Sequence, residues 1–286
     1  MGTGSGPGAG KVAVVTGASR GVGKGVALAL GEEGWTVYVT GRGPIEENDR
    51  LRRSADEVTS RGGAGGAGVA VACDHRDDAQ IAALFDRVDA ERGRIDLLVN
   101  NVWAGPAYDR AAEPFWRRPL SDWDSLITVG LRAHYVASVA ATARMVRRGS
   151  GLIVNISSFG TRRHLHSVLY GMSKAAIDKM TADMAVELAG HEVTVLSLWL
   201  GLVRTERVLA KGVETIAGFP IAEAETPEFE GRVIAALAAD PKVRARSGQT
   251  LISAETAAEY GVTERDGRLP ASHRAAFGGG PVFPVP

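Results

Sequence analysis

The chain has 286 residues, of which 45% are hydrophobic, and its 33 lysine and arginine residues equal its 33 aspartate and glutamate residues in number. Without net charge it has no long-range field that would attract phosphate backbones or anionic lipids. The composition therefore argues against nucleic-acid and membrane-surface binding and favours small-molecule chemistry. Cys73 is the only cysteine and no Cys/His cluster has zinc-site spacing, which excludes an intrachain disulfide and fits a reducing cytoplasm.

The first ten residues, MGTGSGPGAG, have neither the basic nor the apolar region of a signal peptide, and we expect them to form a disordered tail. The longest strongly apolar stretch, residues 193–203, is well short of the roughly 20 residues that a membrane-spanning helix needs. We therefore expect no membrane anchor.

Short apolar, β-branched runs alternate along the chain with segments of helical periodicity, a pattern typical of parallel sheets that helices cover on both faces. Strands are predicted at residues 12–16, 36–40, 69–73, 97–100, 152–157, 193–199 and 250–253. Helices are predicted at residues 23–33, 49–61, 77–92, 121–147, 170–189 and 227–238, with Asp77 and Ser121 as N-caps and Gly34, Gly93 and Gly149 as C-terminal stops. The pattern predicts one α/β domain over residues 11–270, with a doubly wound, parallel, seven-stranded sheet. Its ligand crevice should lie at the carboxyl ends of the strands.

A glycine-rich turn, TGASRGVG at residues 16–23, lies between the first strand and the first helix. Its glycines allow the backbone to approach a pyrophosphate closely, and the helix N-terminus offers free N–H groups and the positive end of its dipole. In this position the turn favours dinucleotide binding in a Rossmann fold over a purely structural role. The residues expected to line the cofactor here are Gly17, Ser19, Arg20, Gly21, Val22 and Gly23.

Arg42 follows the second strand, where a Rossmann fold discriminates between its two nicotinamide cofactors. An acidic residue there binds the ribose 2′-hydroxyl of NAD, whereas an arginine accommodates the 2′-phosphate of NADP through charge-assisted hydrogen bonds. Arg20 could approach the same phosphate from the other side. The pair favours NADP(H), with NAD(H) as the alternative.

Tyr170 and Lys174 open a helical segment with the sequence YGMSK. Their i,i+4 spacing places the phenol and the ammonium on one helix face, and a nearby cation favours the phenolate of a tyrosine whose pKa is otherwise near 10. This pair by itself is a common accident of sequence. Upstream, however, the strand at 152–157 ends at two hydroxyl residues, Ser157 and Ser158.

Together these patterns resemble the classical short-chain dehydrogenase/reductases, over roughly residues 11–255. TGASRGVG is similar to the family's TGxxxGxG cofactor motif and YGMSK to its YxxxK motif. Asp74 matches its adenine-contacting aspartate, Asn100 begins the equivalent of its NNAG motif, and GLVRT at residues 201–205 is similar to its PG-V-x-T segment. The resemblance therefore adds Asp74, Asn100, Val203 and Thr205 to the expected cofactor site, together with Tyr170 and Lys174.

By this resemblance Tyr170 is the general acid/base, Lys174 binds the nicotinamide ribose and lowers the tyrosine pKa, and a serine at the strand end orients the substrate carbonyl. The family's usual serine-to-tyrosine spacing selects Ser157, whereas alignment on the strand selects Ser158. A slip of one residue would turn every strand side chain to the opposite face, while loops absorb deletions readily. We therefore expect Ser158 to be catalytic.

Three positions depart from the family pattern. Gly130 stands where the family has a fourth catalytic residue, an asparagine, so that only a backbone carbonyl remains there to hold a proton-relay water. The NNAG motif is altered to NNVWAG at residues 100–105, and Leu200 replaces the proline of the PG-V-x-T segment. None of these changes removes the acid/base pair.

Residues 206–226, which contain Gly212, Gly218 and Pro220, resemble the family's mobile substrate lid, and residues 271–286 are expected to form a C-terminal tail. Trp103, Phe115 and Trp116 follow the fourth strand and either fill the core or form an apolar wall for a bulky substrate. His164 and His166 have no third ligand at metal spacing, so no metal site is expected.

The leading interpretation is an NADPH-dependent oxidoreductase that transfers hydride between the nicotinamide and a bulky apolar carbonyl compound or its secondary alcohol. The alternative is a nucleotide sensor or scaffold protein that keeps the fold and has lost the chemistry. The helices at 121–147 and 170–189 are long and rich in small and apolar residues, with Ala137 expected on an exposed seam. Paired about a two-fold axis, they predict a homodimer or homotetramer.

Overall fold

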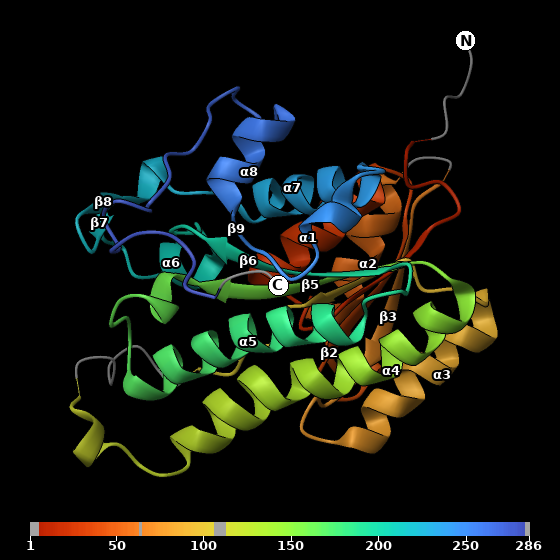
Figure 1. The fold of residues 1–286 in the computed structure, drawn as a ribbon, viewed down its shortest axis with the longest axis horizontal. Coiled ribbons are helices and arrows are strands. Elements are labelled where there is room, and N and C mark those ends of the chain that lie inside the picture. Colours follow the sequence, from red (N-terminus) through yellow and green to blue (C-terminus); the bar gives the residue numbers. More distant parts are fainter. Residues whose placement is uncertain (1–5, 63–64, 106–112, 284–286) are drawn as a thin grey trace.

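Seven parallel strands form a single sheet in the computed structural model, which describes residues 6–62, 65–105 and 113–283 (Figure 1). The strand order is β3-β2-β1-β4-β5-β6-β9, so the order reverses between β1 and β4 and places the ligand crevice at their carboxyl ends. The seven-stranded, doubly wound sheet expected from the sequence is confirmed. Its strands are β1 Val12–Val15, β2 Thr36–Gly41, β3 Ala67–Ala72, β4 Leu97–Asn100, β5 Gly151–Ser158, β6 Val193–Leu200 and β9 Thr250–Ile252.

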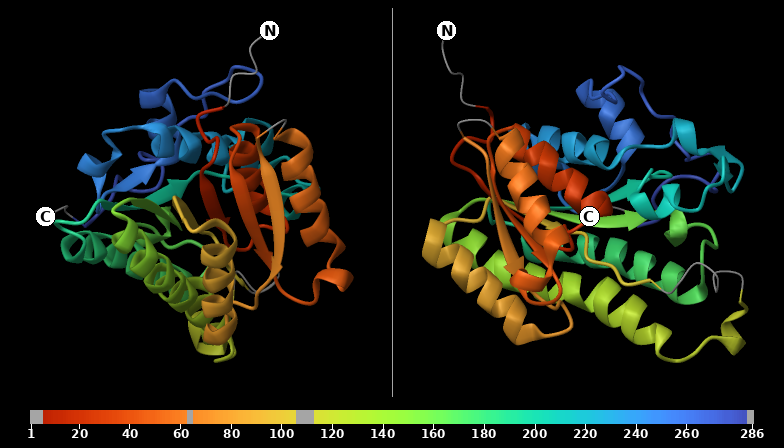
Figure 2. Two further views of the ribbon diagram at one scale, coloured as in Figure 1. Left: turned by 90° about the vertical axis from the view of Figure 1, so that its right-hand side faces the viewer. Right: turned by 180° about the vertical axis from the view of Figure 1, so that it is seen from behind.

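Helices cover both faces of the sheet, as Figures 1 and 2 show. One face packs against α1 Gly21–Glu32, α2 Asp49–Arg61, α7 Pro227–Ala239 and α8 Ser253–Tyr260. The other packs against α3 Asp78–Arg92, α4 Ala133–Arg148 and α5 Val168–Glu187. Because both faces are covered, the central strands are buried along their whole length, which explains why their sequences are apolar throughout.

Local signals set most helix ends. Asp77 accepts hydrogen bonds from the amides of Ala79 and Gln80 and caps α3, while Gly93 and Gly149 adopt the left-handed conformation after α3 and α4. The long helix expected at 121–147 differs from a plain α-helix, because its first part, η4 Asp124–Arg132, is π-helical. Such windings occur often at functional sites, and Gly130 lies within this one.

Together η4 and α4 form one continuous helical stretch, Asp124–Arg148. Among the described residues it is the only helix long and apolar enough to cross a membrane. Almost half of its apolar window, 44%, is buried inside the protein. Length and composition alone do not distinguish such a segment from the core helix of a soluble domain, and its buried side packs against the sheet.

Both predicted tails have ordered parts. Residues 7–10 form a turn in which the amide of Gly8 donates to the carbonyl of Glu33 (2.9 Å), so the expectation of disorder over 1–10 does not hold for these described residues. At the other end, Arg162 donates from both Nε and Nη2 to the carbonyl of Gly278 (3.1 and 2.7 Å), which holds the segment after residue 270 on the protein surface.

Candidate active site

The phosphate loop has the geometry that an anion requires. Gly17 and Gly21 have φ values of +66° and +59°, which residues with a Cβ rarely adopt, and a Cβ at Gly23 would lie 2.6 Å from the carbonyl oxygen of Gly17. No side chain caps α1 at Arg20, and its first turn contains no acidic residue. The first amides of α1 therefore remain available for a phosphate, although Gly21 donates to Glu206 Oε2 (3.0 Å) here.

Three residues outside the expected cofactor site, Asn101, Thr40 and His75, hold this loop. Asn101 donates from Nδ2 to the carbonyls of Thr16 and Gly17 (2.8 and 3.1 Å), and its backbone amide donates to Thr16 Oγ1. On the other side Thr40 Oγ1 accepts the Gly17 amide (3.1 Å) and bonds His75 Nε2 (2.8 Å). Burial lowers the pKa of His75 to about 4, so this ring is a neutral structural group.

Asn100, expected at the cofactor, points elsewhere. It is fully buried, and its Nδ2 donates to Asn155 Oδ1 (2.8 Å), to Ser138 Oγ (2.9 Å) and to the carbonyl of His134 (3.3 Å). Its side chain therefore joins β4 to β5 and α4, and it is the second asparagine of the pair that reaches the phosphate loop.

Two of the charged residues expected near the adenosine, Arg42 and Asp74, lie near each other after β2 and β3, whereas Arg20 precedes α1. Arg42 and Arg20 are exposed. Hydrogen bonds from Arg76 hold the pKa of Asp74 below its usual value, and the charge of Arg42 lowers it further, which places Arg42 and Asp74 at one edge of the sheet. Arg76 Nε lies 3.0 and 3.1 Å from the two carboxylate oxygens of Asp74.

Tyr170 and Ser158 meet at the carboxyl end of β5. The Tyr170 hydroxyl donates to Ser158 Oγ (2.8 Å), which also accepts the amide of Gly160 (3.0 Å). Ser157 lies on the opposite face of the strand, where its hydroxyl donates to the carbonyl of Lys174 (3.3 Å). The structure thus brings Ser158, rather than Ser157, to the tyrosine, as the alternation of strand side chains predicts.

Lys174 lies behind this pair, and its Nζ is 5.8 Å from the centre of the Tyr170 ring. The side chain is buried and donates to the carbonyl of Ile156 (3.0 Å). Burial lowers the pKa of Lys174 to about 8, against the opposing effect of Asp178. The ammonium is therefore charged at neutral pH and close enough to the phenol to favour its ionised form.

Aromatic side chains surround Tyr170. The rings of Trp103 and His166 meet it edge to face at centroid distances of 6.2 and 4.8 Å, and the guanidinium of Arg207 lies 5.9 Å from the Trp103 ring. A Cβ at Gly130 would lie 3.3 Å from Cδ1 of Trp103, so the missing side chain at Gly130 leaves space for this indole. Trp103 is therefore well placed to form the expected wall.

Phe115 and Trp116, the other aromatic candidates, contribute neither to the core nor to this wall within the described residues. They are 65% and 70% exposed and pack edge to face on each other (5.4 Å) in η3 Phe115–Arg117. His134 on α4 is buried, its Nε2 lies 3.0 Å from the carbonyl oxygen of Val102, and burial lowers its pKa to about 3.

The expected lid at 206–226 has structure of its own. It consists of α6 Glu206–Leu209, the antiparallel pair β7 Thr215–Ile216 and β8 Phe219–Pro220, and η6 Ile221–Glu223. Thr205 caps α6 by accepting the Val208 amide (3.3 Å), and its methyl group would lie 3.6 Å from a Cβ at Gly21. Val203 pairs with Glu225 across the base of the lid. Thr205 thus lies beside the phosphate loop, whereas Val203 is placed only at the base of the lid.

The C-terminal segment lies against this lid rather than forming a free tail. Phe277 packs on Phe219 of β8 and on Phe159, which follows Ser158, at 5.3 Å from each ring. His273 contacts Phe219 as well (4.3 Å), and Phe159 packs on Trp199 of β6 (5.0 Å). One aromatic cluster therefore joins the lid, the residue that follows Ser158, strand β6 and the segment at 273–277.

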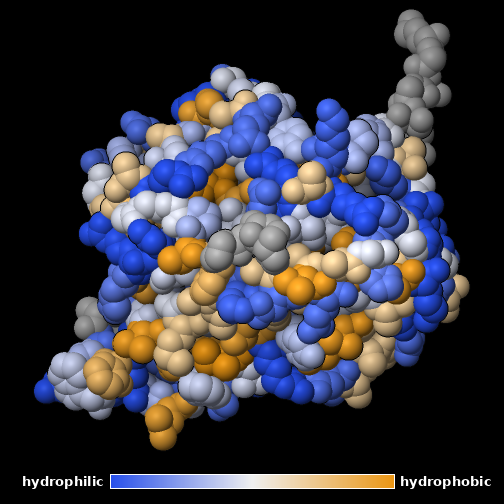
Figure 3. All heavy atoms as spheres, in the orientation of Figure 1, coloured by the Kyte–Doolittle hydropathy of each residue, from blue (hydrophilic) through white to orange (hydrophobic). Residues whose placement is uncertain are grey.

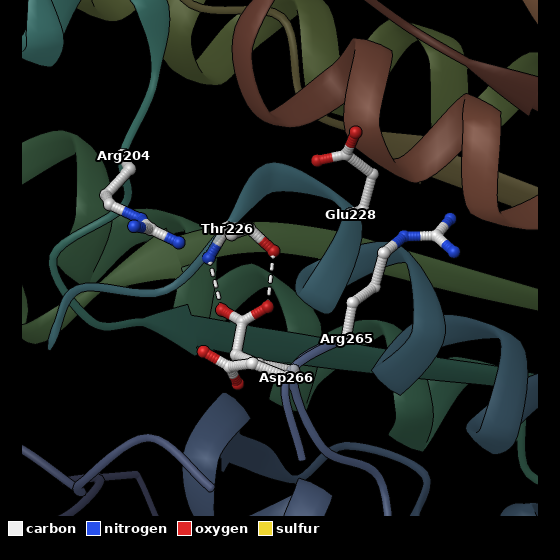
Figure 4. A pocket seen from close by; sticks show the side chains of 6 residues that line it. Arg204, Thr226, Glu228, Arg265 and Asp266 are labelled. Carbon is white, nitrogen blue, oxygen red and sulfur yellow. Dashed lines mark hydrogen bonds between the residues drawn. The ribbon is translucent and has the colours of Figure 1, made fainter. Parts of the chain in front are cut away.

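A cavity of about 270 Å³ opens at the base of the lid (Figure 4), and Tyr170 is not among its lining residues. Glu264 there accepts the amide and the hydroxyl of Thr226, both at 2.6 Å. Cationic and anionic side chains alternate around the cavity, so its charge defines no ligand. Its lining residues are Arg204, Thr226, Glu228, Glu264, Arg265 and Asp266. Among the described residues, no three histidine, cysteine or acidic side chains come together as metal ligands would.

Comparison with known proteins agrees with this geometry. The family model described as short chain dehydrogenase matches residues 11–213. Dehydrogenase/reductase SDR family member 1 of Mus musculus and of Homo sapiens are each 44% identical to the chain over 273 residues, which cover 91% of this chain and 84% of the relative. The 3-oxoacyl-[acyl-carrier-protein] reductase of Synechocystis sp. is 33% identical over 243 residues, covering 84% of this chain and 94% of the relative.

Solved structures show the same relationship. A metagenomic short-chain oxidoreductase in complex with NADP is 32% identical, with a TM-score of 0.66, and covers 82% of this chain and 93% of its own. A short-chain type dehydrogenase/reductase from Mycobacterium ulcerans is 26% identical, with a TM-score of 0.74, over 85% and 87% of the two chains. The chain therefore belongs to the short-chain dehydrogenase/reductase family of oxidoreductases.

Proposed function

We propose that this protein is an NADPH-dependent reductase of bulky carbonyl compounds that also catalyses the reverse oxidation of secondary alcohols. The observation that carries the proposal is the hydrogen bond between Tyr170 and Ser158 (2.8 Å) with the buried Lys174 behind it. This arrangement combines a proton donor, a second hydroxyl and a fixed positive charge at the end of the sheet where the phosphate loop lies.

The roles of the residues follow from their positions. A nicotinamide cofactor bound along the phosphate loop would exchange hydride with the carbonyl carbon. Ser158, whose oxygen accepts the Gly160 amide, donates its own hydroxyl hydrogen to the carbonyl oxygen, and the Tyr170 hydroxyl, which donates to Ser158 in this structure, turns its proton to the same carbonyl oxygen when substrate binds. Tyr170 gives its proton to that oxygen as negative charge develops there, and the ammonium of Lys174 stabilises the phenolate left behind.

NADP(H) is the cofactor that the charges support. Arg42 directly after β2 and Arg20 before α1 are both exposed, and no acidic residue directly follows β2 in the sequence. The related metagenomic enzyme was solved with NADP, which agrees with this choice. Trp103 and His166 around Tyr170 support a bulky, partly apolar substrate.

The decisive experiment compares the purified protein with Tyr170→Phe over a panel of ketones, aldehydes, quinones and secondary alcohols, following the reduced nicotinamide by absorbance. Phenylalanine keeps the ring and removes the proton donor, so we expect kcat to fall by at least about 100-fold while the Kd for NADPH stays within about twofold. Full turnover by Tyr170→Phe would contradict the assignment.

A nucleotide sensor or scaffold is the second candidate, because Gly130 lacks a side chain where the family has a catalytic asparagine. Tight NADPH binding without turnover of any compound in the panel would support that function instead.

A further inference from the structure

Asp178 is a buried carboxylate that the proposed reaction does not yet use. It lies on α5, one helical turn after Lys174 and two turns after Tyr170, and its exposed fraction is 1%. A carboxylate in such a position is costly unless hydrogen-bond donors surround it.

Three hydrogen bonds from two other elements reach the carboxylate, and with the Ser157 hydroxyl on β5 they lower the pKa of Asp178 against burial, which raises it. Thr161 Oγ1 donates to Oδ2 of Asp178 (2.6 Å), Trp199 Nε1 donates to the same oxygen (2.8 Å), and Ser197 Oγ donates to Oδ1 (2.6 Å). Ser197 and Trp199 belong to β6, whereas Thr161 ends the short helix η5 Phe159–Thr161. Asp178 therefore ties α5 both to the sheet and to η5.

The segment held by Thr161 is the one that supports Ser158. Ser158 Oγ accepts the amide of Gly160, in the middle of η5, and a Cβ at Gly160 would lie only 2.6 Å from Cε1 of Tyr170. The backbone of η5 therefore packs directly against the tyrosine ring. A shift of Thr161 would move the serine against the tyrosine, and displacements near 1 Å at such sites can cost about 100-fold in rate.

Asp178 also bears on Lys174 through its charge. The groups that face the ammonium are Tyr170 and Asp178 on α5, the carbonyl of Ile156 on β5, and His134 on α4, whose ring is neutral. Asp178 is the carboxylate that opposes the effect of burial on the lysine. Without it, Lys174 would lose its proton at lower pH.

We propose that Asp178 is a positioning residue for hydride transfer: through Thr161 it fixes the segment that carries Ser158 against Tyr170. The inference rests on the proposed reductase function and adds a residue to it.

Three variants separate the two effects. Asp178→Asn removes the charge and disrupts the hydrogen bonds, whereas Thr161→Val removes one hydrogen bond and keeps the charge. Asp183→Asn, on the exposed side of α5, is the matched control, because among the described residues Asp183 pairs only with Lys179. We expect Asp178→Asn to lower kcat by at least about tenfold and to move the alkaline limb of kcat/KM to lower pH. Thr161→Val should lower kcat severalfold and leave that limb in place, while Asp183→Asn changes neither.

The double variant Asp178→Asn/Thr161→Val should be no slower than Asp178→Asn, because both changes break the same link. A wild-type kcat and pH profile in Asp178→Asn would overturn the proposal. If that variant does not fold, Thr161→Val decides, and an unchanged kcat there overturns the positional role.

Failure of the proposed function is a separate outcome. If the wild-type protein turns over none of the panel, the pKa of Lys174 is measured by NMR of its side-chain carbon signals in the wild type and in Asp178→Asn. A lower pKa in the variant supports the electrostatic role whatever the reaction, and an unchanged pKa overturns it. If Asp178→Asn does not fold, the pKa of Lys174 is measured in Thr161→Val instead. This variant keeps the charge of Asp178, so its Lys174 must have the wild-type pKa, and a different value overturns the electrostatic role.

Discussion

Arg42 is the residue whose chemistry most directly sets the choice of cofactor. It is exposed at the end of β2, its carbonyl accepts a hydrogen bond from Asn48 Nδ2 (2.8 Å), and its charge acts on Asp74 at the same edge. The backbone at the strand end is therefore held while the guanidinium remains able to reach a phosphate.

We expect NADPH to bind at least about tenfold more tightly than NADH, a difference of about 1.4 kcal/mol. Arg42→Asp should reverse the preference, because a carboxylate repels the 2′-phosphate and accepts from the 2′-hydroxyl. Fluorescence titration with both cofactors measures the effect. Arg50→Asp, at an exposed position on α2, is the control for a general change of charge, and equal affinities in the wild type would refute the argument.

At the scale of elements, the contact between α6 and α1 links the lid to the cofactor site. Glu206, the first residue of α6, accepts a hydrogen bond from the Gly21 amide at the N-terminus of α1 (3.0 Å). Its negative charge lies at the positive end of the helix dipole, the end that a pyrophosphate would use.

Replacing Glu206 by glutamine should therefore favour cofactor binding. Glutamine keeps an acceptor for the Gly21 amide but removes the charge that competes with phosphate, so the Kd for NADPH should fall by about two- to fivefold at low salt. The gain should shrink as salt is added. Glu214→Gln, at an exposed position in the same lid, should leave the Kd unchanged, and an equal gain there would show that the effect is not local.

For the whole molecule, the structure corrects the expected interface seam. Ala137 is fully buried in the core, as are Ala133 and Ala141, so an arginine at Ala137 would disrupt folding rather than assembly. The exposed apolar side chains lie on other faces of the same helices, and Figure 3 shows apolar residues gathered over this side of the protein. They include Tyr135 and Val139 on α4 and Met172 and Val186 on α5, each about half exposed.

We propose that these two helices form the two-fold interface of a homodimer or homotetramer. Val139→Arg should then yield smaller particles in light scattering and a lower kcat, because α5 carries Tyr170 and Lys174. Ala83→Arg, at an exposed position on α3, provides the control. A monomeric wild-type protein, or an unchanged oligomer in Val139→Arg, would contradict this prediction.

The sequence determined the architecture because its signals are local. Apolar β-branched runs mark all seven strands of the main sheet, Gly93 and Gly149 end their helices, and the choice of Ser158 over Ser157 follows from the alternation of side chains along one strand. The helix α8 was missed, although Gly261 with its positive φ marks its end.

The tertiary structure alone decided which distant residues meet. Asn101 rather than Asn100 holds the phosphate loop, Trp103 occupies the space left by Gly130, and Asp178 joins η5 to β6. The segment after residue 270, expected to be a tail, packs on the lid through Phe277. Spacing along a chain records which face of its own helix or strand a side chain occupies. Its partners depend on the order of the strands in the sheet and on the close packing of the layers around them, and no local pattern encodes those.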